Sequence, residues 1–169
     1  MKQKLLKICL IIAMTFIALM MFTGCGDEDS SKEDFNEYQQ VAVNYFKAFS
    51  KGDAESYMEC MPPQMINYYD IEEPGFYKNL VEDMSKGLQE KYGDDIKMSF
   101  EFKDEKKYSD DELKSLEAQV LERYSKEIEF SQGYELKVKM DIKGSDKEDT
   151  ETQVIKVCMV EYKWYVIDV

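Results

Sequence analysis

Histidine is absent from the chain, and its absence decides which chemistry the remaining side chains could perform. Without histidine there is no Ser-His-Asp triad, no Cys-His pair and no histidine-ligated zinc site. Histidine is also the one side chain that titrates near neutrality without special surroundings. Acid–base catalysis would therefore need a carboxylate, tyrosine, lysine or cysteine with a shifted pKa.

The charge of the chain excludes a further class of partner. The sequence has 35 acidic and 22 basic residues, a formal net charge of −13. Nucleic acid is not an expected partner, because binding to phosphates requires a basic face. A solvated surface explains the acidity most simply, and an acidic patch for a cationic partner is the alternative. No cofactor or metal site is expected, since the acidic run after residue 25 lacks the ligand spacing and turn glycine of a calcium loop.

The N-terminal segment, residues 1–24, has the layout of a secretory signal. Residues 1–7 are basic, and residues 8–22 are an uninterrupted apolar run. As a helix this run would span about 22 Å at ~1.5 Å per residue, less than the ~30 Å hydrocarbon core of a bilayer. The pattern is typical of a signal peptide rather than a transmembrane helix.

The residues that end this segment are more specific. Phe22-Thr23-Gly24-Cys25 resembles a bacterial lipobox, although an aliphatic residue is usual where Phe22 stands. In lipoproteins that carry this motif, the cysteine is linked to diacylglycerol and becomes the new N-terminus. The resemblance implies processing at Phe22–Gly24 and lipid attachment at Cys25. The alternative is an uncleaved signal anchor with an incidental cysteine.

The anchor and the residues after it predict a location. Diacylglycerol supplies two acyl chains, which hold a protein at a membrane firmly where one chain does not. Residues 25–34 hold the lipidated cysteine and an acidic run without apolar residues, which indicates a disordered tether. We therefore expect the domain of residues 35–169 at the outer face of the cytoplasmic membrane.

Apolar spacing along residues 35–169 predicts the elements of this domain. Three- and four-residue steps favour helices over 35–51, 54–61, 74–92 and 109–128, with a helical turn or loop over 64–73. Gly52 and Gly93 fit helix ends, and Ser109 with Glu112 fits a capping box.

Alternation of apolar and polar residues predicts the strands. It marks strands over 96–103 and 134–142, an apolar and hence central strand reaching 160, and a last strand over 164–169. Strands with one polar face favour an antiparallel sheet covered on one side. The sequence thus predicts an α+β fold, with helices on one face of a four-stranded antiparallel sheet and a helix inserted between strands one and two.

Two stretches resemble a known family. "VAVNYFKAFSKGDAESYMECM" is similar to the opening of nuclear transport factor 2-like, or cystatin-like, domains, and "VIKVCMVEYKWYVIDV" is similar to their closing hairpin. The whole resembles small lipoproteins of Gram-positive bacteria that carry this domain. The inserted helix over 109–128 departs from the pattern. Because the family holds enzymes as well as binding and dimerisation modules, the resemblance does not fix a function.

The resemblance also implies where a site would lie. Enzymes of this fold place an acidic or histidine base and tyrosine or aspartate donors in a cone between sheet and helices. The residues that could line such a cavity, or simply pack in the core, are Tyr45, Tyr57, Tyr68, Tyr69, Asp70 and Trp164. Such a cone could also hold a small apolar ligand.

Two cysteines remain within the domain. Cys60 and Cys158 could form a disulfide after export, or pack as two free buried thiols. The function expected is that of a membrane-anchored, non-enzymatic binding or accessory domain for a protein or small ligand, with a dimer left open. The alternative is a ketosteroid-isomerase-like enzyme that uses carboxylate and tyrosine chemistry in the cone.

Overall fold

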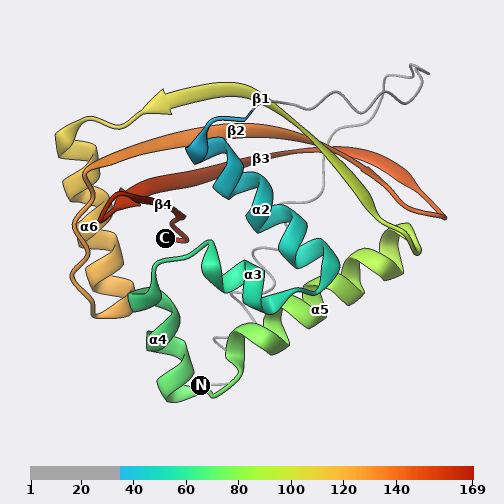
Figure 1. Cartoon of the computed structure of the whole chain (residues 1–169), viewed down its shortest axis with the longest axis horizontal. Coiled ribbons are helices and arrows are strands. Elements are labelled where there is room, and N and C mark those ends of the chain that lie inside the picture. The colour runs from blue at the N-terminus through green and yellow to red at the C-terminus, as the bar shows by residue number, and fades with distance from the viewer. Residues whose placement is uncertain (1–34) are drawn as a thin grey trace. The chain divides into compact units, whose positions relative to one another are not determined.

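The alternating and helical patterns produce the elements seen in the structure, a computed structural model that describes residues 35–169 (Figure 1). The elements in chain order are α2 (Glu37–Lys51), α3 (Ala54–Glu59), α4 (Pro63–Glu72), α5 (Phe76–Tyr92), β1 (Lys97–Lys107), α6 (Asp110–Tyr124), β2 (Gln132–Lys143), β3 (Glu148–Val160) and β4 (Lys163–Val166). The expected lipobox and lipid site, Phe22–Gly24 and Cys25, lie outside the described residues.

Four antiparallel strands form one open sheet in the order β1-β2-β3-β4, which confirms the predicted class and strand number. β2 and β3 pair without interruption from Gln132 opposite Met159 to Lys143 opposite Glu148. The register of β1 on β2 shifts between Phe102 and Asp104, as at a β-bulge. β3 lies between β2 and β4, as its apolar sequence predicts, and α6 is the predicted helix between the first two strands.

Local signals set most helix ends. Gly52 ends α2 in the left-handed conformation, at φ 72°, and the Asp53 carboxylate accepts the Ser56 N–H at 3.1 Å to begin α3. Ser109 and Glu112 form the capping box of α6. The prediction that Pro74 opens a helix is wrong by two residues, because α5 begins at Phe76 after Gly75 in the left-handed conformation.

Two hydrophobic clusters share the side chains of β3. Ile155 and Val157 join the cluster that α2 makes with the sheet, in which the Phe46 ring stacks on Phe100 at 5.9 Å. Cys158 and Val160 join the second cluster, which contains residues of α3, α4, α5 and α6. The alternation of a strand thus ties two sets of helices to one sheet. No helix within residues 35–169 is long and apolar enough to span a membrane.

Candidate functional site

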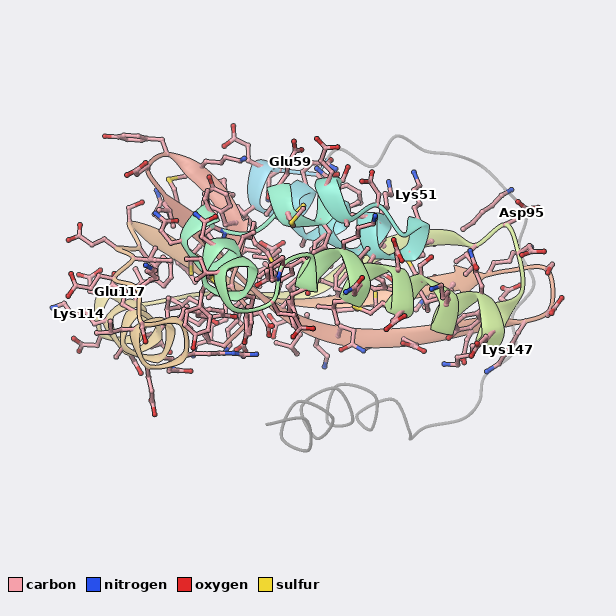
Figure 2. All side chains as sticks on the ribbon, turned by 90° about the horizontal axis from the view of Figure 1, so that it is seen from below. Lys51, Glu59, Asp95, Lys114, Glu117 and Lys147 are labelled. Atoms are coloured by element: carbon pink, nitrogen blue, oxygen red, sulfur yellow. The ribbon has the colours of Figure 1, made fainter. Side chains whose placement is uncertain are left out.

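A groove of about 830 Å³ runs along one side of α2. We call it the α2–α3 groove, because α2 and α3 form two of its walls and the β3–β4 turn forms the third. Figure 2 shows Lys51 of α2 and Glu59 of α3 on the same side of the molecule. Its lining residues are Phe35, Glu37, Gln40, Val41, Asn44, Lys47, Ala48, Lys51, Asp53, Ser56, Glu59, Cys60, Tyr162, Lys163 and Trp164.

Helical spacing explains why α2 offers one wall of the groove. The lining positions of α2 recur at three- and four-residue steps, so they share one stripe of the helix. Val43 and Phe46 lie off this stripe and are buried against the sheet. The turn at Gly52 then folds α3 back beside α2, where the Asp53 N–H donates to the Ala48 carbonyl at 2.9 Å.

The β3–β4 turn carries unusual backbone geometry. Glu161 and Tyr162 connect the paired residues Val160 and Lys163, and both have positive φ, 48° and 69°. Two-residue hairpin turns of this kind usually contain Asn-Gly, since other side chains are strained there. Tyr162 is also 95% exposed, so its ring gives the fold almost no burial. A strained turn that holds an aromatic ring in solvent is a feature that packing does not explain.

Trp164 lines the groove and packs among aromatic rings. Its ring centroid lies 5.3 Å from that of Tyr38 and 5.8 Å from that of Tyr134. Tyr38 and Tyr134 stack on each other at 4.2 Å. Trp164 is the single tryptophan of the chain and is 8% exposed. The sequence placed Trp164 among the candidate cavity residues, and the structure places it in the groove, apart from the tyrosines proposed with it.

Three lysines give the groove cationic positions. Lys47, Lys51 and Lys163 make no ion pair within residues 35–169. The Asp53 carboxylate is engaged by Ser56, whose hydrogen bonds lower the pKa of Asp53. Lys47 and Lys51 lie one helical turn apart on α2, so their charges add at the end of the groove where α2 turns into α3.

Of the remaining cavity candidates, Tyr57 is buried, and Tyr45, Tyr68 and Tyr69 are half-buried and pack against the second hydrophobic cluster. The Tyr45 and Tyr57 hydroxyls are 2.9 Å apart and hydrogen bond to each other. Burial raises the pKa of both tyrosines well above the ordinary value. Tyr68 and Tyr69 pack edge-on against Tyr124, each with ring centroids 5.8 Å away. The side chain of Asp70, the carboxylate proposed with them, lies outside the described part of the structure.

Sequence reasoning missed two residues near these tyrosines, Asp168 and Tyr77. The Tyr124 hydroxyl and the Arg123 guanidinium both donate to the Asp168 carbonyl, at 2.8 and 3.1 Å. The buried hydroxyl of Tyr77 has no hydrogen-bond partner within the described chain. An acid near the end of the apolar run "WYVIDV" was the available signal for Asp168. Tyr77 looked like any other member of a helical stripe.

In the structure Cys60 and Cys158 are buried free thiols. Burial raises the pKa of Cys60 to about 11 and that of Cys158 to about 12. The Cys60 thiol also donates to the Ser56 carbonyl at 3.2 Å. Both thiols therefore stay protonated at neutral pH and are poor nucleophiles. Across residues 35–169, no cluster of three or more acidic, cysteine or histidine side chains could hold a metal ion.

No protein-family model matches the chain, and no curated protein matches its sequence.

Proposed function

We propose that the chain is a lipid-anchored, extracytoplasmic binding domain whose α2–α3 groove receives part of another protein. The observation that carries the proposal is the strained β3–β4 turn, which holds Tyr162 in solvent at the edge of the groove. Tyrosine is enriched at the centres of protein interfaces, where it supplies large apolar area and a hydrogen-bonding tip. Strain retained at an exposed position fits a turn kept for contact rather than for stability.

The anchor is the second part of the proposal. The lipobox-like Phe22–Gly24 and Cys25 would hold the domain at the outer face of the cytoplasmic membrane. A partner at the same membrane then meets the groove at a raised effective concentration, so a modest intrinsic affinity suffices.

We also propose that the domain belongs to the nuclear transport factor 2-like, or cystatin-like, proteins. The α+β class, the antiparallel order β1-β2-β3-β4 and the contact of α2 with the sheet support this assignment. The helix α6 is the element that departs from the pattern.

The alternative, a ketosteroid-isomerase-like enzyme, draws support from Tyr77 and Asp168. The Tyr77 hydroxyl is buried without a hydrogen-bond partner in the described chain, and burial, with a smaller contribution from the Asp168 charge, raises the pKa of that tyrosine. However, the Tyr45 and Tyr57 hydroxyls are paired with each other, and their rings pack at 4.7 Å. A reaction site there would have to break this pair, and for this reason we favour binding at the groove.

Photo-crosslinking on intact cells tests the proposed function. A photoreactive amino acid is placed at Tyr162 in the full chain, and a matched one at Asp95, which Figure 2 shows at one end of the molecule and away from Glu59. We expect a discrete crosslinked band from Tyr162 and none from Asp95. The proposal is wrong if both positions give the same products, or if neither gives any while Cys25 carries the lipid.

A further inference from the structure

The free edge of β4 faces the α2–α3 groove. The Ile167 N–H donates to the Lys156 carbonyl of β3 at 2.9 Å, whereas the Val166 N–H donates away from β3, to the Cys60 carbonyl at 2.7 Å. Backbone N–H groups two residues apart point to the same side of a strand. The N–H and carbonyl of Trp164 therefore point away from β3 as well.

Trp164 is the position of β4 where this edge makes no hydrogen bond within residues 35–169. The end of α3 already covers Val166 through Cys60. No hydrogen bond joins the outward N–H or carbonyl of Trp164 to any residue of 35–169. Trp164 is one of the residues that line the groove, and Tyr162, whose side chain is exposed, lines it two positions earlier. A donor and an acceptor on one strand residue match the main chain of an added strand.

We propose that the occupant of the groove is an extended segment of a partner protein, which pairs its main chain with Trp164 and places a carboxylate between Lys47 and Lys51. This inference rests on the proposed function and specifies the partner that the same site would take. The main-chain groups of Trp164 require an extended rather than a helical segment, because a helix has no free main-chain donors along its length.

Charge complementarity selects the side chains of the segment. Lys47 and Lys51 make no ion pair within residues 35–169 and lie one turn apart on the wall of the groove, where the Lys47 ammonium lies 5.8 Å from the centroid of the Phe100 ring. Asp53, the acid that lines this end of the groove, accepts hydrogen bonds from Ser56 and also interacts electrostatically with Lys51. A carboxylate in the segment therefore meets two ammonium groups there. The groove edge at Tyr162 suits an aliphatic or aromatic side chain.

The sole tryptophan makes the inference directly measurable. Because Trp164 is the only tryptophan, all tryptophan emission of the full chain reports on the groove. The probe is an alternating valine–glutamate peptide of about nine residues, or ~30 Å as a strand at about 3.3 Å per residue. Its matched control carries lysine in place of glutamate. Two further peptides carry N-methyl groups on alternate backbone nitrogens, one peptide for each register.

The full chain, purified from membranes in a mild detergent, is titrated with each peptide. We expect a saturable change in Trp164 emission with the glutamate peptide and at least tenfold weaker binding of the lysine peptide. One of the two N-methylated peptides should bind at least tenfold more weakly than the other, because only one set of amides faces β4. Lys51→Glu should weaken the glutamate peptide about fivefold, and the control Lys114→Glu on α6 should leave it unchanged.

Other outcomes overturn the inference and separate it from the proposed function. If both N-methylated peptides bind equally well, the proposed main-chain pairing with β4 is wrong. If the lysine peptide binds as well as the glutamate peptide, the proposed carboxylate between Lys47 and Lys51 is wrong. Binding that occurs only after deletion of residues 26–34 assigns the groove to the chain's own acidic segment. If no peptide binds while Tyr162 still crosslinks a partner in cells, the groove is an interface but the occupant is not an extended acidic segment.

Discussion

Replacing the β3–β4 turn by Asn-Gly, in the double variant E161N/Y162G, should stabilise the domain while weakening its binding. Each non-glycine residue in the left-handed region costs about 1–2 kcal/mol, and both Glu161 and Tyr162 lie there. Glycine removes that cost at one position and asparagine part of it at the other. Glycine also makes the unfolded chain more flexible, which offsets ~0.5–1 kcal/mol of this gain in stability.

The net gain is about 1 kcal/mol of unfolding free energy, because the 95% exposed ring of Tyr162 contributes almost no burial. For a domain of this size that corresponds to roughly 3–5 °C in melting temperature. The assay is urea and thermal unfolding of residues 35–169, followed by far-ultraviolet circular dichroism, with the peptide titration run on the same variants.

The matched control is Tyr162→Ala, which removes the ring but keeps a side chain in the left-handed conformation. Its stability should stay within about 0.5 kcal/mol of the parent, and its peptide binding should fall as in the double variant. If E161N/Y162G melts at or below the temperature of the parent, the turn is not strained. The backbone geometry of Glu161 and Tyr162 would then no longer support binding at the groove.

Three further predictions concern the anchor, the thiols and the interior. Cys25→Ala should release the protein from membranes or leave the precursor uncut, as fractionation and blotting would show, and unchanged membrane association would exclude a lipoprotein. Cys60 and Cys158 should resist alkylation in the native state and react once the protein is unfolded. Burial raises their pKa to about 11 and 12, so above about pH 9 the folded state holds more protons than the unfolded state. The free energy of unfolding should therefore fall as pH rises above about 9. Native alkylation as fast as in urea would contradict their burial. Tyr77→Phe should raise the free energy of unfolding by about 1 kcal/mol, because it removes a buried hydroxyl without a hydrogen-bond partner in the described chain. Tyr124→Phe should lower it by about 1 kcal/mol, because it removes the hydrogen bond to the Asp168 carbonyl. Equal effects of the two variants in urea unfolding would contradict this difference between the two hydroxyls.

Local chemistry made the helix ends and the sheet predictable from the sequence. The Gly52-Asp53 pair and the Ser109–Glu112 box act within a few residues, so their signals are complete in the sequence. Strand alternation acts in the same way and gave the order of elements. The limit appears at Pro74, where the next residue, Gly75, takes the left-handed conformation and delays the helix.

The groove could not be predicted in this way, because its walls are far apart in the chain. The stripe of α2 reads as an ordinary solvated face until Tyr162 and Trp164 are placed beside it. The strain at Glu161 and Tyr162 carries no sequence signal either, since neither residue is a usual choice for positive φ. The sequence grouped Trp164 with Tyr45 by residue type, but pairing of β4 with β3 decides which side of α2 it occupies.

The helix inserted between β1 and β2 also has a consequence for the order in which the fold forms. β2 and β3 are joined by a short turn and pair along their whole length, so closing this hairpin costs little chain entropy. β1 can pair with β2 only after the chain of α6 has been looped out between them. We therefore expect the β2–β3 hairpin to form the folding nucleus, with β1 added late. Substitutions in the β2–β3 turn should slow folding, while substitutions in α6 should chiefly speed unfolding.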